Sequence, residues 1–325
     1  MGAVLLTGQR MILESESYID AMHGILFPMG WIACSKSMLA GMSAAAFRFT
    51  VNRRLTPESV TAYNWMAEHF LAADFLGVTA SQNAGFYFQP TFPLYQRQAV
   101  AAIKDSLDRG TGAVIWKDKF VIAAGYDDER EVLYISDGTA EDYEALPYGD
   151  FGCNRSPYWY VQTFETRIES DEMEIYLESL LQAIYKWESH DLMLPEKEYA
   201  CGRSAYGAII HALRGGHYDP AGLREIIRCY GAAKRDSHAY IAALERWMPQ
   251  IREAANAYAR LDSIFQQLAM INAGMMPVRR LNASEAKDMI DLFDDALMVE
   301  ETAIRSLKGL MRETVDNRFN DIALR

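Results

Sequence analysis

Hydrophobic and polar positions predict a group of strands near the middle of the chain. Residues 113–116 and 120–124 are apolar and rich in β-branched or aromatic side chains, and residues 131–136 follow after a polar turn. Strand runs joined by such a turn predict a β-hairpin. Just before them, residues 94–109 repeat apolar side chains at helical spacing and stop at Gly110. We therefore predict a helix, a strand and a long hairpin in that order.

The first part of the chain predicts shorter elements. A first strand is expected within residues 1–13, and residues 18–26 carry apolar side chains at helical spacing, with Ser15 or Ser17 as the N-cap. Between this helix and the hairpin, the pattern predicts a short helix at 38–42, a strand at 46–51, a helix over 61–71, and a strand and turn at 81–93. A last strand is predicted at 158–168.

The pattern changes after this last strand. Helical periodicity then dominates, over residues 173–187, 203–213, 221–229, 239–271 and 283–315. Pro249 is expected to kink or split the fourth of these segments. The change predicts two domains, an α+β domain over residues 1–168 and an all-α helical bundle over residues 169–325.

Composition narrows the classes of function. The chain has 325 residues, of which 50% are hydrophobic, and a formal net charge of −12. A negative charge of this size argues against non-specific binding to nucleic acid or to an anionic membrane. No apolar run approaches the roughly 18 residues that span a bilayer, and the N-terminus has no basic flank typical of a signal peptide. We expect a soluble cytoplasmic protein.

The cysteines and histidines do not predict a metal site. The four cysteines are far apart, with no CxxC pair, and the six histidines form no HxxxH or ExxH pair. We expect free thiols, no metal site and no cofactor.

The hairpin region carries a family resemblance. Helix, strand and hairpin, with Gly-Tyr-Asp-Asp at 125–128, resemble the second half of the papain-like cysteine peptidase domain of bacteriocin-leader peptidases, and of butirosin biosynthesis protein H and its relatives. In those families a catalytic His opens the strand that corresponds to residues 119–122, and an Asp closes the next strand. Here Lys119 stands in place of the His. The Asp is present as Asp137, 18 positions later.

The same resemblance indicates the other site residues. The family nucleophile is a Cys at the start of the first helix, where the helix dipole favours a thiolate. Ser17 is the best match to this position, and Ser15 is the second. Gln9, which precedes this helix, matches the oxyanion-hole glutamine of papain-like enzymes.

Two interpretations of these residues stay open. Lys119 and Asp137 form an ion pair in a former active-site cleft, or a desolvated Lys119 acts as the base for Ser17. Cys34, with His23 or His69 as its base, is a rival nucleophile. Its structural alternative is a small buried residue.

Three further residues are candidates for binding a substrate. Arg48, Asn64 and Trp65 offer a cation, an amide and a flat aromatic surface, which are suited to lining a ligand pocket. The structural alternative is a capped helix start with a buried Trp.

The resemblance implies that the protein handles acyl groups. Leader peptidases cleave peptides, and butirosin biosynthesis protein H transfers an aminoacyl group from a carrier protein to an aminoglycoside. Our first hypothesis is a catalytically degenerate member that binds a small acylated molecule or peptide in the cleft between its domains. The alternatives are an active acyltransferase or amide hydrolase, which takes a small or carrier-borne substrate, and a structural or regulatory module that acts through the helical half. The sequence makes no prediction of oligomeric state.

Overall fold

The computed structural model describes residues 2–273 and 279–321, and its internal contacts divide the chain into two compact units. The sheet unit comprises Met1–Leu39 and Trp65–Ser170, and the helical unit comprises Ala40–Asn64 and Asp171–Arg325. One division of the chain therefore falls close to the predicted boundary at 168/169. Residues 40–64, however, which we predicted to be part of the first domain, belong to the helical unit.

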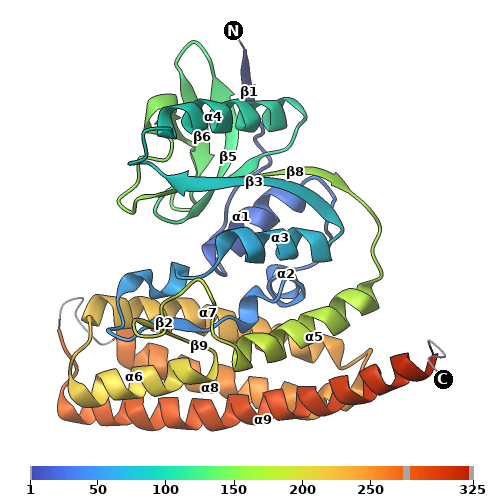
Figure 1. The fold of residues 1–325 in the computed structure, drawn as a ribbon, viewed down its shortest axis with the longest axis vertical. Helices are drawn as coiled ribbons and strands as arrows, with labels where there is room; N and C mark the ends of the chain where they lie inside the picture. Colours follow the sequence, from blue (N-terminus) through green and yellow to red (C-terminus); the bar gives the residue numbers. More distant parts are fainter. Residues whose placement is uncertain (1, 274–278, 322–325) are drawn as a thin grey trace. The chain divides into compact units, whose positions relative to one another are not determined.

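An antiparallel sheet forms the centre of the sheet unit (Figure 1). Among the described residues it has seven strands in the order β3-β8-β4-β5-β6-β7, and β1 pairs with β5. The central strand and hairpin are thus confirmed. The strands are β1 (Ala3–Leu5), β3 (Val78–Phe86), β4 (Ala113–Trp116), β5 (Phe120–Asp127), β6 (Val132–Ser136), β7 (Glu144–Pro147) and β8 (Tyr158–Arg167).

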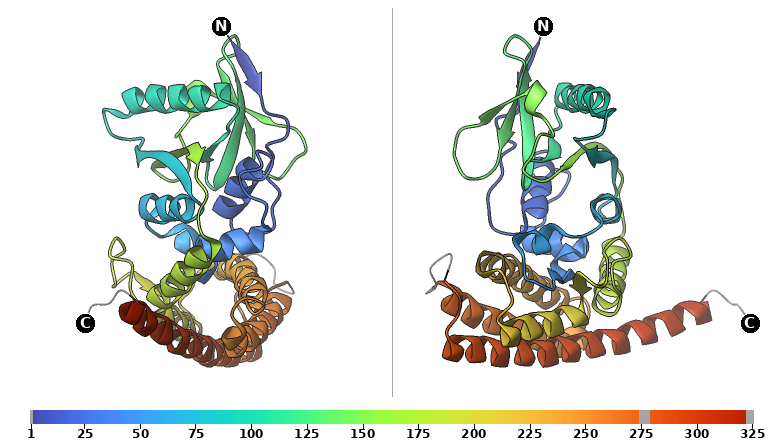
Figure 2. Two further views of the ribbon diagram at one scale, coloured as in Figure 1. Left: turned by 90° about the vertical axis from the view of Figure 1, so that its right-hand side faces the viewer. Right: turned by 60° about the vertical axis from the view of Figure 1, so that its left-hand side comes forward.

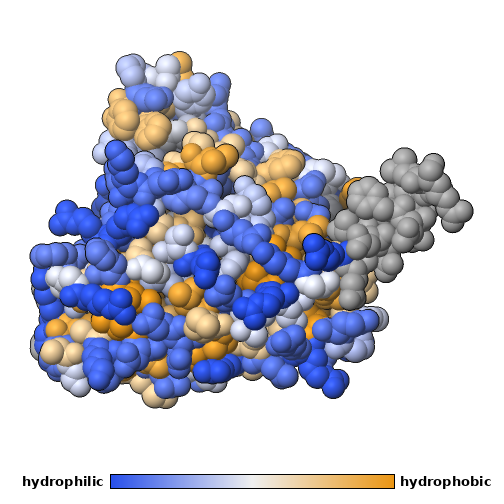
Figure 3. Space-filling view, turned by 60° about the horizontal axis from the view of Figure 1, so that its bottom comes forward, coloured by the Kyte–Doolittle hydropathy of each residue, from blue (hydrophilic) through white to orange (hydrophobic). Residues whose placement is uncertain are grey.

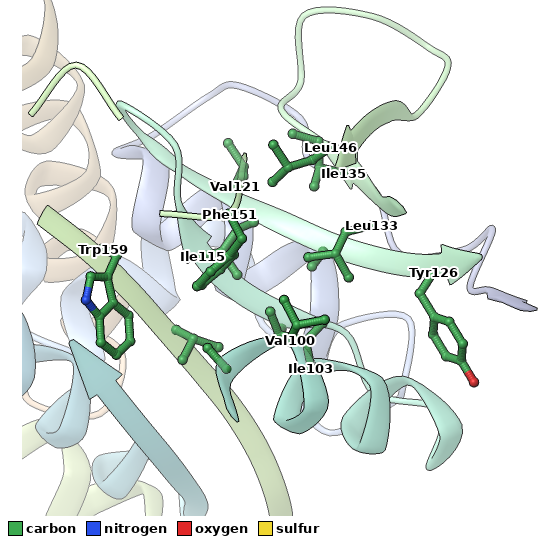
Figure 4. Packing of buried hydrophobic residues seen from close by; sticks show 14 of the residues in the cluster. Val100, Ile103, Ile115, Val121, Tyr126, Leu133, Ile135, Leu146, Phe151 and Trp159 are labelled. Atoms are coloured by element: carbon green, nitrogen blue, oxygen red, sulfur yellow. The ribbon is translucent and has the colours of Figure 1, made fainter. Parts of the chain in front are cut away.

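Helices cover both faces of this sheet. Because side chains alternate along a strand, Val121 of β5 packs with residues of one helix, whereas Ile122 faces another. Figure 4 shows Val121 in the same buried cluster as Val100 and Ile103. The latter two belong to α4 (Phe92–Asp108), which runs alongside the sheet in Figure 2. The first helices along the chain are α1 (Ser17–Leu26), α2 (Lys36–Met42), α3 (Trp65–Phe75) and α4 (Phe92–Asp108), and the 3-10 turn η3 (Tyr148–Asp150) follows β7.

The approach of α1 to the sheet depends on Gly24. A Cβ atom at this position would lie 2.7 Å from Cδ1 of Ile122 and 2.4 Å from the carbonyl oxygen of Arg10. Only glycine allows α1 to pack this closely, and this packing holds the N-terminal end of α1 near the start of β5.

The helical unit is a bundle in which α9 contacts α5, α6 and α8 (Figure 1). Helix α7 begins with Asp219 as N-cap and Pro220 at its first position. Pro249 separates α7 from α8, which confirms the predicted break. The elements are η1 (Ala45–Phe47), β2 (Thr50–Asn52), η2 (Pro57–Thr61), α5 (Glu172–Glu188), β9 (Tyr199–Cys201), α6 (Arg203–Gly215), α7 (Pro220–Leu244), η4 (Pro249–Ile251), α8 (Arg252–Ala273) and α9 (Ala283–Asp321).

Residues 40–64 join the helical unit through aromatic packing and backbone pairing. Phe49 is buried, and its ring centroid lies 4.6 Å from that of Tyr206 and 4.7 Å from that of Tyr230. The short strand β2 pairs antiparallel with β9. The strand predicted at 46–51 is therefore mostly wrong, since η1 occupies its first part and the strand β2 begins only at Thr50.

The protein is thus a mixed α and β structure, with an antiparallel sheet and helices, as the sequence predicts at this coarse level. In the part of the chain that the structure describes, no helix combines the length and apolar character needed to cross a bilayer.

Candidate functional site

Ser17 is the first residue of α1 and lies beside the start of β5. The N-cap is Glu16, and it makes no side-chain capping hydrogen bond, so the predicted cap at Ser15 or Ser17 is wrong. The backbone N–H groups in the first turn of a helix have no acceptor within the helix. The N–H of Phe120 donates a hydrogen bond to the Oγ atom of Ser17 at 3.3 Å. Ser17 is therefore hydrogen-bonded to Phe120, the residue that follows Lys119 in the sequence.

Lys119 and Asp137 meet at one end of the β5–β6 hairpin. The pairing of Ile122 with Ser136 brings the residue before β5 and the residue after β6 to the same edge. The Nζ atom of Lys119 lies 3.1 Å from Oδ2 of Asp137, and the side chains are 33% and 24% exposed. This partly open ion pair is within reach of a ligand.

Hydrogen bonds fix the carboxylate of Asp137. Its Oδ1 atom accepts from the N–H of Thr139 at 2.9 Å and from the hydroxyl of Thr139 at 2.6 Å. Partial burial acts to raise the pKa of Asp137, but the hydrogen bonds from Thr139 and the charge of Lys119 outweigh it and lower this pKa to about 2. Asp137 is therefore ionised at neutral pH.

The segment before α1 is anchored to the same end of the sheet. The N–H of Met11 donates to the Oγ atom of Ser136 at 3.0 Å. The buried carboxylate of Asp20 accepts from the N–H groups of Glu14 and Ser15, and it pairs with Nζ of Lys36 at 3.1 Å. These contacts set the position at which α1 begins.

Ser17 and Lys119 present hydrogen-bond donors to this site. In the residues described, the Oγ atom of Ser17 has one partner, the N–H of Phe120, which leaves its own proton to be donated elsewhere. An ammonium group has three N–H donors, and Lys119 directs one toward Asp137. The ion pair thus directs the amine of Lys119 toward the carboxylate of Asp137.

Gln9 does not present an oxyanion-hole donor. Its side chain is 4% exposed; its Nε2 donates to the carbonyl of Gly110 at 3.0 Å, and its Oε1 accepts from the N–H of Gly112 at 2.7 Å. Both ends of the amide therefore tie the segment before α1 to the start of β4. The predicted substrate-binding role of Gln9 is replaced by a structural one.

The predicted group of Arg48, Asn64 and Trp65 is divided between the units. Arg48 is buried in the helical unit, where its guanidinium lies 3.5 Å from the ring centroid of Tyr63. The N–H of Asn64 donates to Asp191 at 3.0 Å.

Trp65, in contrast, starts α3 of the sheet unit and packs on Phe120, with ring centroids 5.1 Å apart. Trp65 thereby contacts the residue that follows Lys119.

At the rival site around Cys34, ring nitrogens of both candidate bases contact oxygen atoms. The Nε2 atom of His23 lies 3.1 Å from the carbonyl oxygen of Cys34, and burial lowers the pKa of His23. His69 is 1% exposed and stacks on Tyr18 with ring centroids 3.4 Å apart. The Nδ1 atom of His69 lies 2.9 Å from the hydroxyl of Tyr160. Both imidazoles are thus engaged in buried contacts.

A buried aromatic cluster that was not predicted from the sequence lies next to Ser17 and Lys119 along the chain. Tyr18 and Phe120, each the residue that follows one of them, pack on His69, and the hydroxyl of Tyr18 donates to Oε1 of Gln162 at 3.0 Å. In the sequence, the aromatic residues at positions 18 and 120, next to the two candidate site residues, could have indicated this cluster. These contacts join the residues that follow Ser17 and Lys119 to one buried aromatic cluster.

No model of a known protein family matches this chain, and no curated protein gives a significant match. Among residues 2–273 and 279–321, no three His, Cys, Asp or Glu side chains lie close enough together to hold a metal ion. Function is therefore inferred from the geometry of Ser17, Lys119 and Asp137, together with the resemblance of the hairpin region.

Proposed function

We propose that this chain is a catalytically degenerate papain-like protein that binds a small acylated molecule or a peptide at Ser17 and Lys119. One observation carries the proposal: the start of the first helix and the Lys119–Asp137 pair lie together, with the N–H of Phe120 bonded to Ser17. These are the positions that nucleophile, base and orienting acid occupy in the families that the hairpin resembles.

The residue types at these positions support binding rather than catalysis. A serine hydroxyl is a weak nucleophile unless a base removes its proton. Lys119, which stands in place of the histidine, forms an ion pair with a carboxylate, and loss of the nucleophile or base of a triad lowers the rate by about 10⁶. A site with serine and lysine in place of cysteine and histidine still offers hydrogen-bond donors to a ligand.

The ligand class follows from these donors. A carbonyl or carboxylate oxygen would accept hydrogen bonds from the hydroxyl of Ser17 and the ammonium of Lys119. An acyl group or the carboxylate of a peptide offers this oxygen, and the half-buried ring of Trp65 offers an apolar surface for the remainder.

Native mass spectrometry of freshly purified protein tests this proposal, followed by calorimetric titration with a panel of N-acyl amino acids and short acylated peptides. We expect a retained or titrated ligand in the wild type, and binding at least about tenfold weaker in Lys119→Met. Lys117→Met is the matched control, because Lys117 forms a separate ion pair with Glu144 close by. Equal binding by Lys119→Met, or no binding by the wild type, would contradict the proposal.

An active serine–lysine acyltransferase or amide hydrolase is the second candidate, since Ser17 and Lys119 belong to one site. A fluorophosphonate probe distinguishes it from the first, because it labels activated serines. We expect no labelling of Ser17 in the wild type. Labelling that disappears in Ser17→Ala would establish the enzyme instead.

The third candidate, a structural or regulatory module, would be supported by a continuous apolar patch on the helical unit. The face in Figure 3 instead shows hydrophilic residues between the hydrophobic ones. Among the described residues of the helical unit, the large exposed hydrophobic side chains come from separate elements or connecting segments: Tyr185, Leu192, Met193, Trp247, Met270 and Met298.

A further inference from the structure

Strand β3 is an edge of the sheet with unused backbone hydrogen-bonding groups. Its nine residues pair on one side with β8, and among the described residues no other strand pairs with it. An edge strand directs alternate N–H and C=O groups away from its neighbour, so β3 leaves about four residues with outward-facing groups. Figure 1 shows β3 as a long curved strand. An added strand would find unsatisfied partners here.

This edge lacks most features that block strand addition. Edge strands are commonly protected by charged residues, prolines, bulges or short length. Residues 79–88 contain no charged residue and no proline, and the one register shift of β3 lies at its beginning, between Thr79 and Ala80. Ser81 and Ala84 are exposed. A charged partner would find no oppositely charged side chain in residues 79–88, so we expect an uncharged one.

An aromatic patch lies at the C-terminal end of this edge. It consists of Phe86, Tyr87, Phe88 and Tyr158, which are between 36% and 66% exposed. The ring centroid of Phe86 lies 5.2 Å from that of Phe88 and 5.3 Å from that of Tyr158. Tyr158 in turn contacts Trp65, with ring centroids 5.7 Å apart. Exposed aromatic clusters of this kind are typical of binding surfaces for apolar side chains.

We propose that the edge of β3 binds an extended, uncharged peptide segment of another protein, rich in apolar side chains, by strand addition. Backbone pairing requires an extended chain, the uncharged edge offers no ion-pair partner to a charged segment, and the aromatic patch accepts apolar side chains. A segment of about nine residues matches the length of the strand. This goes beyond the proposed function, because it concerns a second surface and does not require a ligand at Ser17 and Lys119.

Selection of random dodecapeptides by phage display on the full-length protein tests the proposal. We expect enriched peptides with few charges and many β-branched or aromatic residues. Hydrogen exchange measured by mass spectrometry should show new protection of amides in β3 when such a peptide binds. Ala84→Lys should weaken binding at least about tenfold. Ala145→Lys, an equally exposed alanine on the opposite edge strand β7, should bind as the wild type does.

Circular dichroism and thermal melting establish that both variants fold. The proposal is overturned if no peptide is enriched, if protection appears outside β3, or if Ala84→Lys and Ala145→Lys bind equally. Light scattering gives the remaining outcome: a wild-type dimer that Ala84→Lys dissociates would assign this edge to a second copy of the chain, which also overturns the peptide proposal.

Discussion

Lys119 determines what the candidate site can do at the scale of a single residue. An imidazole changes its charge near neutral pH and can pass a proton, whereas an ammonium group beside a carboxylate keeps its proton. The Nζ atom of Lys119 lies 3.1 Å from Oδ2 of Asp137, in a partly exposed ion pair. The same end of a hairpin that could orient a base therefore presents a cation.

The pKa of Asp137 gives a prediction for stability against pH. Its folded-state value of about 2 lies below the ordinary value of 3.8, so the ionised carboxylate stabilises the folded protein above about pH 4, and this contribution is lost as the pH falls toward 2. We expect Asp137→Asn to lower the free energy of unfolding by about 1 kcal/mol at pH 7, because the pair is partly solvated. Urea unfolding at pH 7, 4 and 2.5 measures this.

Glu144→Gln is the control for Asp137→Asn, because it removes the carboxylate of the more exposed pair with Lys117. It should change the free energy of unfolding by less than about 0.5 kcal/mol at each pH. An Asp137→Asn effect that does not shrink at low pH would show that the carboxylate charge is not the cause.

At the scale of elements, the sequence predicts the hairpin and the helix before it because their hydrophobic periodicity is strong. The ion pair of Lys119 and Asp137 was one of two interpretations that the family resemblance left open, and the structure contains this pair. The cap of α1 could not be predicted, because the carboxylate of Asp20 accepts hydrogen bonds from the backbone N–H groups of Glu14 and Ser15 only in the folded chain. Gln9 has the right spacing for an oxyanion hole, but its partners Gly110 and Gly112 lie about a hundred residues away.

The packing of α7 against its neighbours in the helical unit depends on a buried ion pair. Lys234 and Glu300 are nearly inaccessible, with Nζ and Oε1 2.5 Å apart, and the hydroxyl of Tyr206 also donates to Glu300. Because removal of one partner leaves a buried charge, we expect Glu300→Gln to lower the free energy of unfolding by about 3 kcal/mol. Chemical denaturation measures this change.

The neighbouring residue offers a matched control. Glu301 pairs with the exposed side chain of Arg203, so Glu301→Gln should reduce the free energy of unfolding by less than about 1 kcal/mol. The triple variant Lys234→Met/Glu300→Leu/Tyr206→Phe should recover most of the loss, because it replaces the pair and the tyrosine hydroxyl that donates to it by apolar groups that need no partner. Equal effects of Glu300→Gln and Glu301→Gln would contradict this account of the bundle.

At the scale of the whole molecule, the chain passes into the helical unit at residues 40–64 and returns to it after residue 170. The sequence could not predict this, because the partners of the first segment are remote. The N–H of Thr50 donates to the hydroxyl of Tyr230, 180 positions away. Gly222 of α7 packs so closely on the backbone of residues 55–57 that a Cβ atom at position 222 would lie 1.9 Å from the carbonyl oxygen of Leu55.

This arrangement predicts the behaviour of a fragment. Residues 1–170 contain Phe47 and Phe49 without the aromatic residues that bury them. We expect this fragment to bind the dye ANS more strongly than the same fragment with Phe47→Ser and Phe49→Ser, because two large apolar side chains become exposed. Equal dye binding by the two fragments would show that residues 40–64 do not need the helical unit.

The central claim is that Ser17 occupies the nucleophile position of a papain-like site beside Lys119. Alkylation of Ser17→Cys by iodoacetamide tests it most directly, with the rate at each cysteine followed by mass spectrometry across pH. The helix start and the ammonium favour a thiolate, so the pKa of the introduced thiol should fall by about one unit or more, and Lys119→Met should reverse this. The exposed Cys153, whose pKa burial raises, is the internal reference. If the thiol at position 17 reacts no faster than Cys153 at pH 7, the claim is wrong.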